Sequence, residues 1–578
     1  MAQKFNQGPG IYKNEIDASL TTSPVGTSVG AFVGKANEGI VNCRVEITRD
    51  KDLLDQFGNP SESLGYGLFG ALEFLKESDK IYFVRSVSGV ENYAHVSFTT
   101  SGTSVYKQIL ATGSTALLSV NGYEDGNKPN DIYDISTYSF SGEPFVIACQ
   151  GPGTYGNNLA VSITTCAADV SAGFDWKYKY DSNPTTDLDP MWKKIFKINV
   201  YQKANNVVGF GSVSANPVET FYASRQNIVD DNGNNLYVEQ VINGVSKYIY
   251  IKDNTSVAAT TNPGNTGVVQ LLSGTNNSTV PYGAINSAWT LFTDREKVGV
   301  NILVCTEPGN GSSNNYTVQL AVGDIAASRK DCIAVCQVDG TSSTTTNVST
   351  ITAAASYGFV NPSYVALYAG WDMIYDRYND RNIFIPKNIF GASLMARTDA
   401  IGNTWDAPAG TTRGRISSLK QNILFNGTQI GILRDNNINT SKFIQGQGGN
   451  FMWSQKTALR KSSALSDINV RRLLIYVENS IENSLLPFLF ESNNANTRLK
   501  IKSILDGFLG QVAAGGGFNT DEDAGFLVVC DATNNTAQVI NNNTLVIDLY
   551  VKPIRTIEFI QLNTIVTRSG ISFSELGI

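Results

Sequence analysis

The chain has 578 residues, of which 42% are hydrophobic and only 16% are charged, and its formal net charge is -7. A chain of this length is too long to fold around one hydrophobic core, and it indicates about three to four domains. The absence of a basic stripe disfavours nucleic acid as a partner, no run reaches the ~18 apolar residues of a membrane span, and MAQKFNQGPG lacks a signal peptide's apolar core. We therefore expect a protein of cytosol-like conditions without direct membrane insertion.

The chain begins with a predicted extended arm over residues 1–23, which holds Ile11 and Ile16 and is too short and too polar to fold alone. Residues 24–90 predict a compact α/β segment. Its elements are a strand from Thr27 to Val33, a helix within 48–58, a second helix within 63–78 and a buried strand at 80–87.

Residues 91–297 change in composition, because Ser, Thr, Asn and Gly dominate and short alternating runs are separated by turn residues. KIFKINVYQK, ETFYASR, NLYVEQVI and SKYIYIKD are typical of strands, and DDNGNN at 230–235 predicts a hairpin. We expect a β-rich insertion of one or two lobes.

From residue 298 the sequence returns to an α/β pattern. Strands are predicted in VGVNILVC, CIAVC and SYVALYAGWDMIY, and helices within 312–330, with Ser313 as its cap, and within 349–358. This β-α-β-α-β order favours a parallel sheet covered by helices. The strand at 80–87 is expected in the same sheet, so that residues 91–297 loop out of one domain.

The last part of the chain predicts two long helices followed by strands. Pro487 ends or kinks the first helix, and Gly515 to Gly517 end the second. Two β-patterned runs between 544 and 567 are separated by Pro553. In the first run Leu545, Ile547, Leu549 and Val551 share a face; in the second Ile557 and Phe559 oppose Ile560, Leu562, Thr564 and Val566. A long apolar edge strand invites aggregation unless it is paired, so this tail predicts pairing in its own domain or with another chain.

No catalytic, cofactor-binding or metal-binding set is predicted. The seven Cys form no CxxC, and we interpret them as buried hydrophobes in a reducing compartment; His95 is the sole histidine. TEPGNGSS at 306–313 lacks a Walker ending, and Asp376 and Asp380 lack EF-hand spacing. Glu219 and Glu239, expected on strands of the insertion, are interpreted as solvated rather than as a glycosidase pair. Residues 397–410 and 432–453 are predicted to be ordered, irregular connections.

Several stretches, in order, resemble contractile phage tail sheath proteins. They are PGIY, TSPVGTSVGAFVGKANEG, DLLDQFGNP, IYFVRSV, GTYGNNLAVSI, the hairpins from ETFYASR to SKYIYI, ARTDAIGNTWDAPAG, LRDNNINT, INVRRLLIYVENSI, FLVVCDATNNT and IDLYVKPIRTIEFIQLNTIVT. The resemblance spans most of the chain.

The resemblance implies an α/β core, formed by a mixed sheet with helices and discontinuous in sequence, with a large β-rich insertion and extended N- and C-terminal arms. The expected divisions are an arm at 1–23, a core of 24–90 plus 298–543, an outward-facing insertion at 91–297 and C-terminal strands and arm at 544–578. The arms would pair as strands with neighbouring subunits. The residues assigned to this pairing are Ile11, Tyr12, Glu15, Ile16, Ile557, Phe559, Ile560, Leu562, Ile565 and Val566.

The function implied is that of a structural, non-enzymatic sheath without cofactors, in which stacked hexameric rings surround a tail tube and contract to drive it through the host envelope. Its partners would be other copies of the chain, the tail tube protein, and baseplate and tail terminator proteins, in a virion assembled in the host cytoplasm. Two alternatives remain open at this stage: the sheath of a related contractile injection system, and an α/β nucleotide-binding enzyme with a β insertion.

Overall fold

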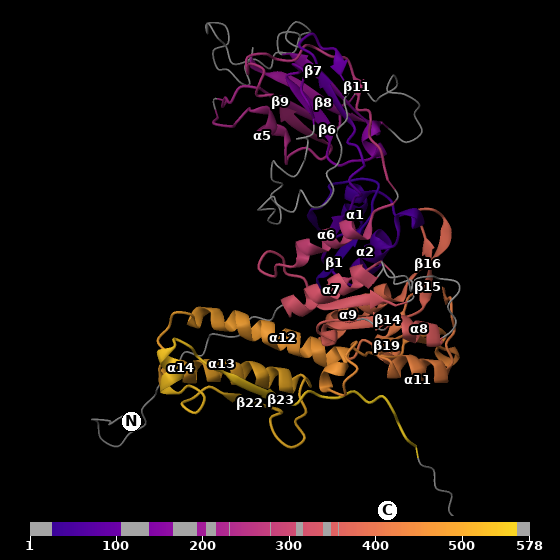
Figure 1. Cartoon of the computed structure of the whole chain (residues 1–578), viewed down its shortest axis with the longest axis vertical. Helices are drawn as coiled ribbons and strands as arrows, with labels where there is room; N and C mark the ends of the chain where they lie inside the picture. Colours follow the sequence, from indigo (N-terminus) through magenta and orange to yellow (C-terminus); the bar gives the residue numbers. More distant parts are fainter. Residues whose placement is uncertain are drawn as a thin grey trace, which may run out of the picture. The chain divides into compact units, whose positions relative to one another are not determined.

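The structure, a computed structural model, describes residues 26–105, 138–165, 194–203, 216–230, 232–277, 279–307, 316–338, 348–355 and 358–562 (Figure 1). Its contacts separate two compact units. The core unit is Ser23–Glu482, and the second unit joins Met1–Thr22 to Asn483–Ile578. We call the described residues 483–562 the C-terminal unit. Among all described residues, no helix has the length and apolarity needed to cross a membrane.

The core unit is organised around a seven-stranded sheet in the order β19-β14-β13-β12-β1-β3-β2. Every neighbouring pair is parallel except β2 and β3, which are antiparallel. The predicted mixed sheet with helices is therefore confirmed, and β1 and β3 lie in the same sheet as strands that follow the insertion. The strands are β1 Gly30–Gly34, β2 Arg44–Ile47, β3 Ile81–Arg85, β12 Ile302–Val304, β13 Ile333–Gln337, β14 Val365–Tyr368 and β19 Ile438–Asn439.

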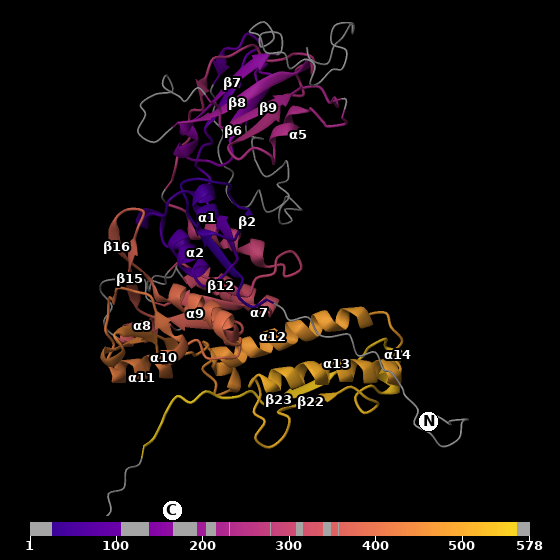
Figure 2. The same cartoon turned by 180° about the vertical axis from the view of Figure 1, so that it is seen from behind.

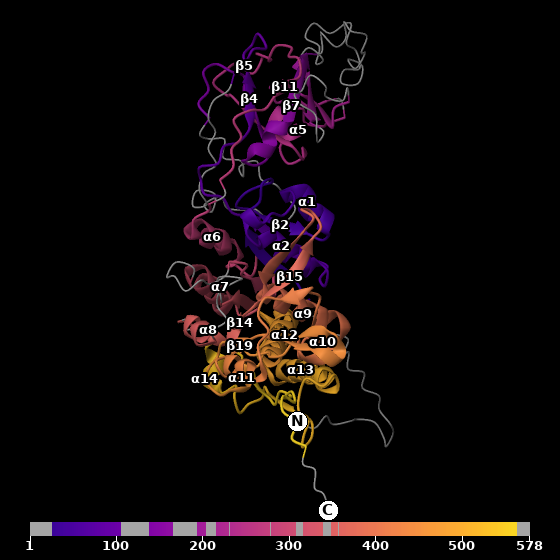
Figure 3. The same cartoon turned by 90° about the vertical axis from the view of Figure 1, so that its right-hand side faces the viewer.

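Helices cover both faces of this sheet, because its buried strands are apolar on both sides. Figure 3 shows α7 and α8 on one side of β14 and α9 on the other. One hydrophobic cluster includes side chains of α6, α7, α8 and α11, and the other includes α1, α2 and α9. The helices are α1 Asp50–Phe57, α2 Gly67–Leu75, α6 Tyr282–Trp289, α7 Tyr316–Arg329, α8 Val348–Ala354, α9 Lys387–Ile401, α10 Gly410–Arg413, α11 Gly427–Asp435 and α12 Ile468–Leu485.

Between β3 and α6 the chain forms two four-stranded antiparallel sheets, in the orders β10-β6-β4-β5 and β11-β7-β8-β9. A separate hydrophobic cluster is formed by residues of these sheets and of the short helix α5. The elements are β4 His95–Phe98, β5 Ser104–Val105, β6 Phe145–Cys149, β7 Leu159–Thr165, β8 Phe196–Gln202, β9 Glu219–Ala223, α5 Val238–Ile242, β10 Ile249–Asp253 and β11 Val269–Gln270.

The end of the insertion lies earlier than the expected residue 297. Ile285, Trp289 and Phe292 are buried in a cluster of the seven-stranded sheet, so α6 packs with the core rather than with the insertion.

At the start of the insertion, the buried Arg85 guanidinium donates hydrogen bonds to the carbonyls of Gly39 (2.6 Å) and Pro152 (2.8 Å). This side chain therefore links the end of β3 to the inserted domain.

The single strand expected over SYVALYAGWDMIY is two strands in different sheets. Gly370 has a φ of +97°, a conformation that favours glycine, and it separates β14 from β15. Strand β15 instead pairs with β16 and β18, and a further sheet has the order β17-β21-β20. The expected irregular stretch from Arg397 is helical up to Ile401, the last residue of α9. These strands are β15 Trp371–Asp376, β16 Arg381–Pro386, β17 Arg415–Ile416, β18 Lys420–Gln421, β20 Ser441–Ile444 and β21 Gly449–Met452.

The C-terminal unit contains α13 (Ala495–Ala514), β22 (Phe526–Val529), α14 (Ala537–Asn541) and β23 (Asp548–Val551). Asn494 caps α13 by accepting a hydrogen bond from the Thr497 amide. The expected boundary at residue 544 falls inside this unit, because β23 pairs with β22. Figure 2 shows both strands beside α13.

Candidate assembly site

The C-terminal unit contains a sheet of only two strands. β22 and β23 pair antiparallel, with Phe526 opposite Val551 and Val529 opposite Asp548. Among the described residues each strand has this one strand partner, so each has an outer edge without a ladder partner. A two-stranded sheet is marginal by itself, and such edges can accept a strand from another chain.

One face of this small sheet is covered and the other is open. Val528 is buried, together with an apolar stripe of α13 formed by Ile501, Leu505, Phe508, Leu509 and Val512. Leu527 and Tyr550, which are directly opposite each other in the ladder, are exposed. The helix therefore supports the sheet from one side, and its outer edges are held at a fixed position relative to α13.

The described end of the chain leaves this sheet just after Pro553. The Asn519 amide donates to the Lys552 carbonyl (2.7 Å), and the Ile554 amide donates to the Gly517 carbonyl (3.2 Å). The expected strand is not found within residues 555–562, to which the structure assigns no strand. Four predicted pairing residues are strongly exposed in this segment: Ile557 (83%), Phe559 (78%), Ile560 (87%) and Leu562 (86%).

The structure brings together none of the predicted pairing residues of the two arms. Those at the N-terminus and the last two at the C-terminus, namely Ile11, Tyr12, Glu15, Ile16, Ile565 and Val566, lie outside the described residues.

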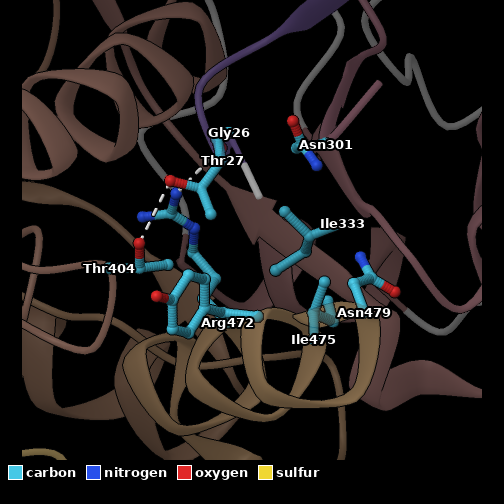
Figure 4. A pocket seen from close by; sticks show the side chains of 9 residues that line it. Gly26, Thr27, Asn301, Ile333, Thr404, Arg472, Ile475 and Asn479 are labelled. Carbon is cyan, nitrogen blue, oxygen red and sulfur yellow. Dashed lines mark hydrogen bonds between the residues drawn. The ribbon is translucent and has the colours of Figure 1, made fainter. Parts of the chain in front are cut away.

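The first described residues of the core unit are anchored by a polar cluster that sequence reasoning missed. The Thr27 hydroxyl donates to Asp399 Oδ2 on α9 (2.7 Å) and contacts the Thr404 hydroxyl (3.1 Å). Arg472 of α12 donates to the Thr27 carbonyl (3.2 Å) and to Asp399 Oδ2 (2.5 Å). Figure 4 shows the Arg472 guanidinium beside Thr27 and a dashed line that joins the Thr27 and Thr404 hydroxyls. Thr27, which we call the root of the N-terminal arm, is therefore fixed to the two long helices α9 and α12.

Burial makes this cluster sensitive to the loss of either charge. The side chains of Arg472 and Asp399 are only 4% and 8% exposed. Beside them lies a cavity of about 10 Å³, lined in part by Asn301, Tyr476 and Asn479, which is about the size that holds one water. A signal was present in the sequence, because Arg472 lies at helical spacing from the apolar Ile468 and Ile475, and a buried arginine needs a partner.

The carboxylates weighed as catalytic groups or metal ligands have structural roles. Glu219 on β9 accepts hydrogen bonds from the Ser246 hydroxyl and the Lys247 amide. Glu239 lies on α5, not on the expected strand, and accepts from the Asp253 amide. The helix arises because Val238 and Ile242, four residues apart, both face the core of the insertion. Asp376 accepts from the amides of Tyr378 and Asn379 in the β15–β16 turn.

The remaining reactive side chains are shielded. Burial lowers the pKa of His95, and a hydrogen bond to the Tyr93 carbonyl partly opposes this shift. Burial raises the pKa of the Cys149 thiol to about 11. The described cysteines are all free and buried, as predicted, and no group of three metal-ligating side chains occurs among the described residues.

Comparisons with known proteins identify relatives of the chain. A family model, the phage tail sheath C-terminal domain, matches residues 460–567, which contain α12, α13, β22 and β23. The tail sheath protein of enterobacteria phage T4 is 34% identical over 59% of this chain, and the match spans about half (53%) of the T4 protein. The tail sheath protein of Salmonella phage ViI is 25% identical, with 99% of this chain and 98% of that protein covered.

A solved structure has a similar fold. The sheath tail protein from Listeria innocua superposes with a TM-score of 0.56 at 11% identity, covering 93% of this chain and 94% of that protein. This likeness shows a shared fold, and the sequence matches to the C-terminal domain model and to the phage ViI protein point to the same group of proteins. The chain is thus similar to phage tail sheath proteins, at higher identity over part of its length and at lower identity over nearly all of it.

Proposed function

We propose that the chain is the structural subunit of a contractile tail sheath, which polymerises as stacked hexameric rings around a tail tube and contracts to drive the tube through the host envelope. Subunits would assemble in the host cytoplasm into the virion, with tail tube, baseplate and tail terminator proteins as further partners. The observation that carries this proposal is the pair of open strand edges in the C-terminal unit, with a strongly exposed apolar segment following them.

Strand exchange between copies would use both features. The exposed segment of one copy, around Ile557 to Leu562, would add to a sheet edge of a neighbour, and the N-terminal arm around Ile11 to Ile16 would do the same. Because the donor and acceptor surfaces differ, such a contact is heterologous and propagates instead of closing a dimer.

The energetics of one donated strand are closely balanced. Burying four large apolar side chains contributes about 6–12 kcal/mol in total. Ordering the eight backbone residues 555–562 costs about 8–16 kcal/mol. Ladder hydrogen bonds add about 1 kcal/mol each, so one strand by itself is near equilibrium. Many such contacts, together with the surfaces between subunits, would make the polymer stable while single contacts could rearrange.

The two alternatives receive less support. The match to phage ViI extends over nearly the whole chain, which favours a phage sheath over that of another injection system. The enzyme alternative requires a reactive set, whereas Glu219, Glu239 and Asp376 each accept hydrogen bonds that fix local structure. We therefore propose a non-enzymatic role without cofactors.

Truncation tests the proposal. A chain that ends at Ile554, and one that lacks residues 1–20, should each remain folded by circular dichroism yet form no tubes in negative-stain electron microscopy. The full chain is expected to form tubes or rings. Tubes of normal length from either truncated chain would refute strand donation, and a full-length monomer that binds nucleotide would refute the sheath assignment.

A proline pair provides a matched control for the C-terminal arm. Ile560→Pro removes a backbone donor inside the proposed strand and should abolish tubes. Ser574→Pro makes a similar change beyond the predicted run and should leave tube formation intact. Equal effects of the two substitutions would contradict a register-specific strand at Ile560.

A further inference from the structure

A polar groove lies on one face of the β17-β21-β20 sheet in the core unit. Its volume is about 420 Å³. Ile416, Asn450 and Phe443 occupy one cross-strand row and form the floor, and Leu419 forms part of a wall. Phe443 and Leu419 are exposed, while Ile416 is buried. The groove thus combines an apolar contact surface with room for a large side chain.

The groove is basic although the chain as a whole carries a net charge of -7. Arg397 and Arg415 both line it. The Arg397 guanidinium donates to the Arg415 carbonyl (3.3 Å) and lies 3.9 Å from Glu77. In the part of the chain that the structure describes, no carboxylate is within ion-pair distance of the exposed Arg415 guanidinium. We call this surface the Arg415 groove.

The floor of the groove is held rigidly from below. The Asn450 side-chain amide donates to the Ser418 hydroxyl (2.9 Å), and that hydroxyl donates to the buried Asp372 carboxylate (3.1 Å). The Asn450 side-chain amide therefore donates within the protein, whereas the exposed Arg415 guanidinium can bind an anion from outside.

The complementary chemistry occurs in a short segment between α12 and α13, which we call the Phe490 corner and which comprises Leu486, Leu489, Phe490 and Glu491. The first three are exposed apolar residues, and Phe490 is fully exposed. Phe490 also has a φ of +69°, a left-handed conformation that is strained for a bulky side chain. A bulky aromatic residue displayed in this way, followed directly by a carboxylate, indicates an interaction surface.

We propose that the Arg415 groove binds the Phe490 corner of a second copy of this chain. Phe490 enters against Ile416, Leu419 and Phe443, and the Glu491 carboxylate pairs with Arg415. Aromatic side chains and arginine are the residue types enriched at the centres of protein interfaces, and arginine can bind a carboxylate through two parallel hydrogen bonds.

The choice of a second copy follows from complementarity in both polarity and charge. The corner presents apolar bulk and one negative charge, and the groove presents the apolar side chains of Ile416, Leu419 and Phe443 and the positive charge of Arg415. The two surfaces differ, so the contact is heterologous and extends from copy to copy. It rests on the proposed sheath function, to which it adds a side-chain contact distinct from strand exchange.

Site-specific cross-linking of the full chain tests this contact. In a chain with Cys166→Ser, one batch carries Ser417→Cys at the groove and another carries Ser492→Cys beside the corner; the described native cysteines are buried. Mixed batches should give a heterodimer with a short thiol-to-thiol reagent. A batch with Ser256→Cys, an exposed position in the insertion, replaces the groove batch as the control.

Charge reversal supplies the specific readout. Arg415→Glu in the groove batch, or Glu491→Arg in the corner batch, should slow cross-linking about tenfold, and the two reversals combined should restore it to within about twofold. Lys500→Glu in the corner batch, which changes an exposed charge on α13, should have no such effect. Cross-linking at the rate of the Ser256 control, or no recovery in the combined reversal, would overturn the proposal.

Negative-stain microscopy of the same samples separates this contact from the sheath function. Tubes combined with control-level cross-linking would overturn the Arg415 contact and leave the sheath function standing. Reversal-sensitive cross-linking without tubes would support the contact and count against the sheath function. Absence of both would overturn both.

Discussion

Replacing Arg472 by methionine removes one charge from the cluster that holds the root of the N-terminal arm. Methionine keeps an unbranched apolar side chain along α12 but leaves the Asp399 carboxylate buried without its cation. Asp399 Oδ1 already lacks a hydrogen-bond partner, and the Thr27 hydroxyl would remain a donor to Oδ2. Breaking a buried pair by removing one partner costs about 3–5 kcal/mol.

The double substitution of Arg472→Met with Asp399→Leu tests whether the loss of stability in the single variant comes from an unpaired buried charge. Removing both charges should be much less costly than removing one, because no uncompensated ion remains in the core. Arg295 and Glu482 provide a matched control at the other end of α12: their side chains are 44% and 48% exposed, and Glu482→Gln should cost only about 0–1 kcal/mol.

Hydrogen exchange followed by mass spectrometry measures the local free energy of opening in α9, α12 and the segment at Thr27. A loss of about 3 kcal/mol corresponds to exchange roughly 10²-fold faster from states that open locally. If Arg472→Met changes exchange by less than about fivefold, or if the double variant opens as readily as the single one, the buried pair does not anchor the arm root.

Three further outcomes are expected. Because burial lowers the pKa of His95 in the folded state, the folded chain binds this proton less readily than the unfolded chain, and the insertion should lose stability as pH falls through the unfolded value of about 6.5. Unfolding midpoints at pH 7.5 and 5.5 should differ more in the native chain than in His95→Gln, and equal differences would exclude His95 as the cause. Gly391→Ala should cost about 1–3 kcal/mol in denaturant unfolding, because the added Cβ would lie 2.4 Å from Cζ of the Tyr368 ring; a neutral result would mean that this ring moves freely. In a Cys166→Ser chain the buried thiols should react with a colorimetric thiol reagent only after denaturation, and rapid reaction in the native state would disprove their burial.

The spacing of apolar residues predicted helices and strands correctly where burial of one face is enough to determine the element. In α12, Val470, Leu473 and Val477 recur at spacings of three and four residues, as one face of a helix requires, and all three are buried. In β23, Leu549 and Val551 share the face that the alternation assigned to them, with Tyr550 exposed opposite. Local spacing is sufficient in these cases, because helices and strands place side chains at fixed angular intervals.

Prediction failed where a distant contact or one backbone angle outweighed the local pattern. Glu239 was assigned to a strand because its neighbours alternate, yet packing against the core of the insertion produced α5. SYVALYAGWDMIY reads as one apolar strand, but the positive φ at Gly370 divides it between two sheets. β-propensity reflects packing context more than intrinsic preference, which explains the first failure.

The sequence by itself determined the order of α/β and β-rich segments, the burial of the described cysteines and the apolar character of the C-terminal run. Only the tertiary structure decided that Thr27, Asp399 and Arg472 meet, because side chains separated by hundreds of residues are brought together by packing alone. It also decided that β22 and β23 form a sheet of two strands, since strand number depends on which backbone groups find partners in the folded chain. The segment from Ile557 to Leu562 has a strand pattern in its sequence, yet the structure assigns it no strand.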